Sequence, residues 1–252
     1  VKEISVLVNE CLISLNVCAG DAVLLHSDAK AAVQFGQYSS YEAIGVLISL
    51  ILDFLGKEGT LIMPAFTYSY TKDEVFDRLN TPSTVGVITE HFRRLHGVER
   101  SDDPIFSICA KGADQSLYVD ARDYYVFGSD SFFSKMRANN VTILGLGCPM
   151  ERGGTYFHYV EKMNLVDYRY EKPFPGYSLN CKTGWSEVSY FVRDLDRNTD
   201  LELSAFKDKM RAESLIQESS LGRIGSWAMK ARDCFDIASE MLSADGSSLI
   251  QR

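Results

Sequence analysis

The sequence lacks the features that place a protein in or across a membrane. Its longest apolar stretch, residues 44–55, is interrupted by Asp53 and is shorter than the roughly 18 residues of a membrane-spanning helix. Residues 1–8 carry Lys2 and Glu3 in an amphipathic pattern without an A-x-A cleavage site, which does not indicate a secretory signal. We therefore expect no membrane span and a cytoplasmic location.

Paired cysteines are also missing. The six cysteines are scattered along the chain without a C-x-x-C pair, which excludes the spacing of a zinc knuckle and argues against a disulfide framework. We expect reduced, mostly buried thiols, and we interpret Cys109 and Cys148 as core residues because no basic partner stands beside either.

The familiar nucleotide and hydrolase motifs are absent, and so is an excess of positive charge. The chain contains no G-x-x-x-x-G-K-[ST], G-x-G-x-x-G, H-E-x-x-H or G-x-S-x-G motif. With 26 Lys and Arg against 34 Asp and Glu, its net charge is -8, so nucleic acid and anionic membrane surfaces are not expected as partners.

Apolar runs of strand type alternate with amphipathic helical patterns throughout the 252 residues. No Gly, Pro or Ser-rich linker divides them, so we predict one domain over residues 1–252 with a three-layer α/β/α fold and a mixed central sheet. The predicted strands are 22–25, 60–63, 105–110, 141–146 and 188–192, and the main predicted helices are 4–15, 41–55 with Ser39 or Ser40 as cap, 83–96, 131–139, 203–216 and 229–242.

Histidine is scarce, with four residues in the chain. His158 and Glu161 lie three residues apart in a predicted helix that follows Gly153 and Gly154, so both side chains share one helix face. A carboxylate in that position orients an imidazole for general-base catalysis, although an ordinary helix-surface pair has the same spacing. His26 follows a predicted strand and is either structural or functional, whereas His91 and His96 are assigned to an exposed helix face.

Residues 100–107 concentrate a guanidinium, two carboxylates and two hydroxyls in one short stretch. One interpretation is a polar loop. In the other, Arg100 binds phosphate or carboxylate, while Asp102 or Asp103 receives a cationic substrate group or holds His158. The spacing alone does not decide between them.

Four ordered motifs resemble the aminoglycoside 3-N-acetyltransferase family. They are G-T-L-I-M-P-A-F-T at 59–67, T-P-S at 81–83 with Gly86, Glu90, Phe92 and Arg93, R-S at 100–101 with Pro104 and Ser107, and T-Y-F-H-Y-V-E at 155–161. The resemblance implies a three-layer α/β/α fold that binds acetyl-CoA and transfers its acetyl group to an amine on a sugar ring. It also implies that His158 matches the catalytic histidine of the family and Glu161 its helix-borne glutamate.

Two departures from the family pattern concern the acceptor. Asp103 stands where members that modify aminoglycosides commonly have a histidine, and residues 68–80 form a short segment with few acidic residues. These departures favour a branch that acts on a nucleotide-linked amino sugar for surface polysaccharide (O-antigen) biosynthesis. The alternative is an aminoglycoside 3-N-acetyltransferase that confers antibiotic resistance. A metal-dependent amidohydrolase using His26, His158, Asp102, Asp103 and Glu161, or a non-catalytic coenzyme A binder, represents a different class.

The expected mechanism is direct acetyl transfer without a metal or a cysteine intermediate. His158 is the expected base, supported by Glu161 and Asp103, and Thr155 or nearby N–H groups stabilise the oxyanion. The small-molecule acceptor would contact Asp102 and Tyr68. The oligomeric state is open, a homodimer being one option. The expected coenzyme A contacts, together with a helix N-terminus near Ser39, are Ser27, Lys30, Arg100, Ser101, Ser107 and Thr155.

Overall fold

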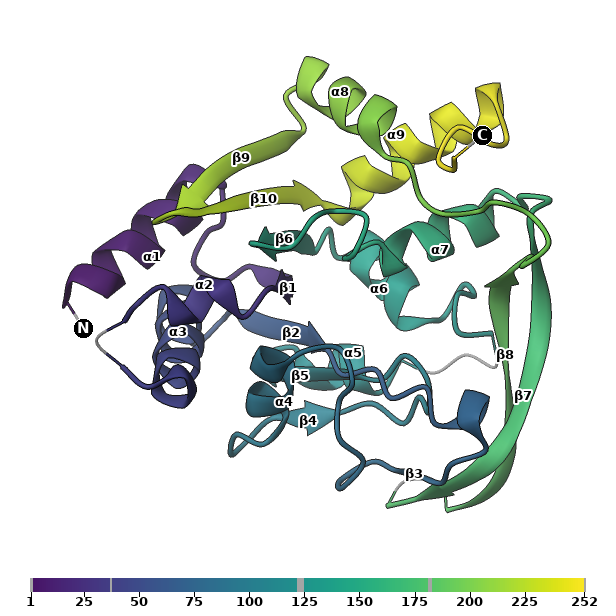
Figure 1. The fold of residues 1–252 in the computed structure, drawn as a ribbon, viewed down its shortest axis with the longest axis horizontal. Helices are drawn as coiled ribbons and strands as arrows, with labels where there is room; N and C mark the ends of the chain where they lie inside the picture. Colours follow the sequence, from purple (N-terminus) through teal and green to yellow (C-terminus); the bar gives the residue numbers. More distant parts are fainter. Residues whose placement is uncertain (1, 37, 122–124, 181–182, 252) are drawn as a thin grey trace.

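The computed structural model describes residues 2–36, 38–121, 125–180 and 183–251, and its centre is a seven-stranded mixed sheet (Figure 1). Three parallel strands occupy the middle of this sheet, in the order β2 (Thr60–Pro64), β1 (Ala22–Ser27) and β6 (Thr142–Leu146). Antiparallel strands extend it on both sides: β5 (Ile108–Gly112) and β4 (Glu99–Arg100) beyond β2, and β10 (Ile224–Lys230) and β9 (Ile216–Leu221) beyond β6.

Each face of the sheet packs against its own layer of helices. Val23 and Leu25 of β1 join one apolar core, whereas Leu24 between them joins the other, because successive strand side chains point to opposite faces. The first core includes α1 (Lys2–Ser14), α3 (Ser40–Leu55) and α4 (Val87–Arg93); the second includes α5 (Gln115–Val119), α6 (Phe132–Ala138), α7 (Thr155–Met163), α8 (Ser204–Ala212) and α9 (Ala231–Ala244). This arrangement confirms the predicted three-layer α/β/α fold with a mixed central sheet.

The starts of α3 and α4 test the predicted helix boundaries. Ser39 caps α3 in a capping box, in which its Oγ accepts from Glu42 N at 3.3 Å and Glu42 Oε2 accepts from Ser39 N at 3.0 Å. The predicted helix 83–96 is too long at its start, since α4 begins at Val87. The N–H of Ser83 donates to Glu90 and that of Thr84 to Phe66 O, which holds this segment as a loop.

A second, three-stranded sheet was largely missed. It contains β3 (Phe76–Asp77), β7 (Arg169–Leu179) and β8 (Gly184–Arg193), and the long β7–β8 hairpin flanks the main sheet (Figure 1). Only 188–192 was predicted as a strand, because Pro173 and Pro175 argue against one. Ser189, which pairs with Pro173, gives its carbonyl to Val126 N. That pair is therefore not hydrogen-bonded, and the proline nitrogen faces away from β8.

The predicted helices at the C-terminal end need correction. The helix predicted over 203–216 ends at Ala212, and residues 216–230 form the β9–β10 hairpin, with Gly222 at φ 59° in the turn. Met229 pairs with Ile216 in this hairpin, so α9 begins at Ala231 and not at residue 229. The remaining short elements are α2 (Lys30–Val33) and a 3-10 helix, Tyr70–Lys72.

Five cysteines lie in the described residues, and all five are free thiols. Three of them, Cys11, Cys109 and Cys234, are buried, while Cys181 lies outside the described residues. Within the described ranges, no helix has the length and apolar character needed to cross a membrane.

Candidate active site

A cleft made of two neighbouring cavities lies where the parallel strands end. β1 ends at Ser27 and β6 at Leu146, and α7 begins at Thr155 after the loop that leaves β6. The carboxyl ends of parallel strands are a common ligand site in α/β folds. One part of the cleft, the histidine arm, has a volume of about 620 Å³, and its lining includes Tyr68, Phe106, Arg152, Thr155, His158, Arg169, Tyr190 and Arg193.

The other part, the strand arm, has a volume of about 400 Å³. It runs between the end of β1 and the start of α4, and its lining includes His26, Ser27, Pro64, Phe66, Gly86 and Cys148. Tyr68, Arg152 and Thr155 line both arms. The two arms are therefore neighbours that share these three residues.

His158 faces the histidine arm and is held from behind by Glu161. The distance from His158 Nδ1 to Glu161 Oε2 is 3.0 Å; the imidazole side chain is 24% exposed, whereas the carboxylate is fully buried. Because an ionised carboxylate only accepts hydrogen bonds, the proton of a neutral imidazole lies on Nδ1. Nε2 then carries the lone pair. The imidazole and the ring of Phe127 form an edge-to-face contact, with 5.9 Å between the ring centroids.

Two residues that follow α7 complete the surroundings of Glu161. Tyr168 donates its hydroxyl to Oε1 at 3.0 Å, and Nε of Arg169 lies 2.7 Å from Oε2. Burial lowers the pKa of His158, and the positive charge of Arg169 lowers it further, against the raising effect of Glu161. The imidazole is therefore neutral at pH 7 and able to accept a proton, as a general base requires.

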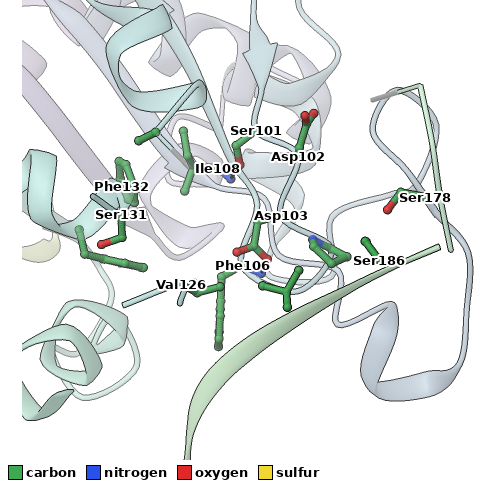
Figure 2. Close-up of a pocket in the computed structure, with 14 residues that line it drawn as sticks. Ser101, Asp102, Asp103, Phe106, Ile108, Val126, Ser131, Phe132, Ser178 and Ser186 are labelled. Atoms are coloured by element: carbon green, nitrogen blue, oxygen red, sulfur yellow. Dashed lines mark hydrogen bonds between the residues drawn. The ribbon is translucent and has the colours of Figure 1, made fainter. Parts of the chain in front are cut away.

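Asp103 belongs to a different cluster, beside a smaller cavity of about 210 Å³ (Figure 2). Its Oδ1 accepts from Tyr190 at 2.8 Å and from the N–H groups of Ile105 and Phe106 at 2.8 and 2.6 Å. Burial raises its pKa. No hydrogen bond or ion pair joins Asp103 to His158 in the described residues, so the predicted support of the imidazole by Asp103 is not seen.

Asp102 and Ser101 line the same small cavity and not the histidine arm (Figure 2). Asp102 forms an ion pair with Arg78 at 3.1 Å, and Ser101 Oγ accepts from Ile108 N at 2.9 Å. These contacts stabilise the loop between β4 and β5. The predicted roles of Asp102 toward the acceptor and of Ser101 toward coenzyme A do not agree with this placement.

The side chains of Arg100 and Ser107 form hydrogen bonds in the protein interior. The Arg100 guanidinium is buried and donates to Ala65 O at 2.7 Å, to Thr81 O at 2.6 Å and to Ser107 Oγ at 3.1 Å. Ser107 Oγ in turn donates to Ala65 O at 2.7 Å. Burial lowers the pKa of Arg100 to about 10, so it stays charged at pH 7. Because these donors are committed, the predicted phosphate contacts of Arg100 and Ser107 do not fit the structure.

Four predicted residues remain at or beside the cleft. Ser27 lines the strand arm, Tyr68 and Thr155 line both arms, and Lys30 begins α2 close by without lining either. Arg152, Arg169 and Tyr190 also line the cleft but were not predicted. The sequence gives no spacing signal for them, because β7 and β8 bring Arg169 and Tyr190 to α7 from outside the helix.

Metal ligation finds no support in the side-chain clusters. Across the described residues, no group of three or more His, Cys, Asp or Glu is arranged to hold a metal ion. Of the residues offered for an amidohydrolase site, His158 and Glu161 bind each other, while Asp102 and Asp103 lie beside the smaller cavity.

Fold and site together define an α/β enzyme in which a carboxylate-oriented histidine faces a cleft at the end of the central strands. A curated relative, aminoglycoside N(3)-acetyltransferase IV of Salmonella sp., is 26% identical over 241 residues, covering 93% of this chain and 85% of the relative. The family model described as aminoglycoside 3-N-acetyltransferase matches residues 24–243. The chain belongs to this family.

Solved structures of similar proteins share the fold. The apoenzyme of aminoglycoside acetyltransferase AAC(3)-IVa has a TM-score of 0.81 and 24% identity, covering 98% of this chain and 91% of that one. A mutant of that enzyme in complex with a gentamicin has a TM-score of 0.79 and 23% identity, covering 97% and 90%. AAC-IIIb as a binary complex with CoASH has a TM-score of 0.77 and 19% identity, covering 94% and 95%.

Family membership confirms the predicted reaction class. The protein is an acyl-CoA-dependent N-acetyltransferase, and acetyl-CoA is its acyl donor.

Proposed function

We propose that the protein acetylates an amine of an aminoglycoside, with acetyl-CoA in the strand arm and the amino sugar in the histidine arm. The observation that carries this proposal is the His158–Glu161 pair, which presents a neutral imidazole to the larger arm. Both arms include Thr155 in their linings, so a donor in one arm and an acceptor in the other are closest near this residue.

His158 acts as the general base in this proposal. A sugar amine attacks the thioester carbonyl carbon only as a free base, and Nε2 of His158 takes the proton that the nitrogen loses as the C–N bond forms. Glu161 holds the Nδ1 proton and stabilises the imidazolium, as a buried carboxylate does behind other catalytic histidines. The C–S bond then breaks, and coenzyme A leaves as the thiol. Acetyl passes directly between the two substrates.

The relatives support an aminoglycoside as the acceptor. The curated relative is named for acetylation of aminoglycosides, and a related enzyme has been solved with a gentamicin. These findings support the aminoglycoside alternative better than the surface-polysaccharide interpretation. The net charge of -8 also favours approach of a cationic drug.

One observation favours a less cationic amino sugar as a second candidate. The lining of the histidine arm includes Arg152, Arg169 and Arg193, while its carboxylates, Glu151 and Asp200, are both engaged in ion pairs. Glu151 pairs with Lys207 at 2.7 Å and Asp200 pairs with Arg193. A polycation would therefore have to compete for these carboxylates.

A thiol-release assay with acetyl-CoA tests the proposal. We expect His158→Gln to lower turnover by roughly 10²- to 10⁴-fold, since glutamine fills a similar space but is not a base. His96→Ala, at an exposed histidine beyond α4, is the matched control and should keep full turnover. Near-normal turnover of His158→Gln would contradict the role of His158 as general base. Absence of CoASH binding in calorimetry at millimolar concentration would contradict the binding of the donor.

The same assay identifies the acceptor. An aminoglycoside panel is compared with a nucleotide-linked amino sugar and with glucosamine, and the products are checked by mass spectrometry. We expect the highest kcat/KM with an aminoglycoside. Preference for the nucleotide-linked sugar would transfer the function to the second candidate while leaving the reaction unchanged.

A further inference from the structure

His26 is a buried histidine that the mechanism above does not use. It is the penultimate residue of β1, lines the strand arm and is 7% exposed. Its Nε2 is buried and has no hydrogen-bond partner in the described part of the chain. Buried polar side chains nearly always have a partner, so this one requires an explanation.

The surroundings of His26 connect it to the catalytic helix. β1 lies between β2 and β6, and His26 pairs with Gly145 of β6. Gly153, two residues before α7, lies against the ring, because a Cβ there would come within 3.0 Å of His26 Cγ. Thr155 follows and lines both arms of the cleft. The imidazole thus lines the strand arm beside the loop that leads into Thr155.

The protonation state of His26 makes it a hydrogen-bond donor. Burial lowers its pKa to about 4, so the ring is neutral at pH 7 and carries one N–H and one lone pair. Of its two nitrogens, only Nε2 is enclosed without a partner. An enclosed lone pair costs less than an enclosed N–H, which favours the proton on Nδ1, the nitrogen that is not enclosed without a partner.

Resting on the proposed function, we propose that His26 is a second catalytic residue whose Nδ1–H donates to the thioester carbonyl oxygen of the acyl donor. As the amine nitrogen bonds to the carbonyl carbon, negative charge develops on that oxygen, and the hydrogen bond strengthens with it. The amine proton goes to His158, and the C–S electron pair leaves with the sulfur of coenzyme A. His26 itself gains and loses no proton.

The experiment compares His26→Leu, which has no donor, with His26→Asn, whose amide nitrogen is bonded to Cγ as Nδ1 of histidine is. Loss of one oxyanion donor lowers kcat by roughly 10²- to 10³-fold, and we expect this loss for His26→Leu with partial recovery in His26→Asn. Calorimetry with CoASH, which has no thioester carbonyl, should give a Kd within about threefold of wild type for both variants. His91→Leu is the matched control, since His91 also has a buried, unpartnered Nδ1 but does not line the cleft.

Acetyl-S-N-acetylcysteamine serves as a second donor because it retains the thioester but lacks the nucleotide. A similar fractional loss in kcat/KM with both donors supports the proposal. Unchanged kcat in His26→Leu overturns it, and so does a loss of CoASH affinity that matches the loss of kcat/KM. If His26→Leu does not fold, unchanged kcat in His26→Gln, whose amide nitrogen corresponds to Nε2 and not to Nδ1, overturns the proposal, and a larger loss in the glutamine variant than in the asparagine variant supports it. Failure of the wild type to release thiol with any amine would instead contradict the proposed function, independently of His26.

Discussion

Two carboxylates near the cleft accept a tyrosine hydroxyl, but they are used differently. Glu161 accepts from Tyr168 and holds His158 and Arg169 on its other oxygen. Asp103 accepts from Tyr190 and from two backbone N–H groups of its own turn. The difference lies in the partners other than tyrosine. These are the titratable side chains of His158 and Arg169 at Glu161, and two backbone N–H groups at Asp103.

This comparison separates a catalytic from a structural use of the same pairing. Glu161 transmits its charge to an imidazole that faces a large arm, so its effect reaches the substrate. Two of the hydrogen bonds on Asp103 come from its own loop between β4 and β5, and the third comes from Tyr190 of β8, so its main effect should be to hold that loop against β8. A substitution at Glu161 should therefore lower turnover, whereas a substitution at Asp103 should mainly lower stability.

The largest effect is expected at Glu161. Glu161→Gln replaces the charge that stabilises the imidazolium and offers Nδ1 an amide that can select the wrong tautomer. We expect kcat to fall on the order of 10²-fold or more, measured by thiol release well below the melting temperature. Turnover within threefold of wild type in a folded variant would contradict the assigned role.

Arg100 tests the structural side of the comparison. Arg100→Met leaves the carbonyl of Thr81 without its guanidinium donor and the carbonyl of Ala65 with Ser107 as its side-chain donor, and we expect a loss of about 2–4 kcal/mol in the free energy of unfolding. CoASH affinity should stay within about twofold by calorimetry. The matched control is Arg94→Met on the exposed face of the same region, where the ion pair with Glu90 is worth less than about 1 kcal/mol. A tenfold loss of CoASH affinity at normal stability would restore the predicted phosphate contact.

Asp103→Asn should have a smaller effect. The amide oxygen still accepts the three hydrogen bonds, but they lose their charge-assisted strength, so we expect a loss of about 1 kcal/mol in chemical denaturation. Turnover should stay within threefold, in contrast to the matched change at Glu161. A larger fall in kcat than in stability would show that Asp103 acts on the reaction.

The smallest effect is a shift in pH dependence. Neutral His158 is the active form, and its pKa lies below the ordinary value of 6.5 because of burial and the charge of Arg169. kcat/KM should therefore fall as the pH drops through that lowered pKa. Arg169→Met removes the positive charge, so the pKa of His158 should rise and the fall should begin at higher pH, by less than about one unit.

Arg169→Lys keeps the charge and is the control for that shift. Its acid limb should stay close to that of the wild type. An acid limb that does not move in Arg169→Met, or that moves to lower pH, would contradict the electrostatic assignment.

The predictable part of the site was the part that depends on local geometry. His158 and Glu161 are three residues apart on one helix, and helical periodicity alone brings them together. The partners of Glu161 beyond the helix could not be inferred in this way. Arg169 lies in β7, which was not predicted as a strand because its two prolines argue against one.

Arg100 illustrates the opposite error. A guanidinium in a polar sequence can face solvent, a phosphate or the backbone, and the sequence R-S-D-D-P does not distinguish these environments. The environment of Arg100 is decided by the carbonyls of Ala65 and Thr81, which accept its hydrogen bonds. These carbonyls come close to Arg100 only when the chain folds. For the fold, the parallel strands were predictable from their continuous apolar runs, whereas the polar edge strand β9 was not predicted, and only its first residue, Ile216, falls in a predicted helix.

The prolines of β7 have a consequence for the behaviour of the protein at high concentration. Beyond the short pairing with β3 at Ser178 and Leu179, the outer side of β7 has no further ladder in the described residues. Such a border invites a strand from a neighbouring molecule, but Pro173 offers no N–H there, and Pro175 has the same orientation two residues later. The same residues that hid the strand in the sequence therefore protect the molecule against self-association along this border.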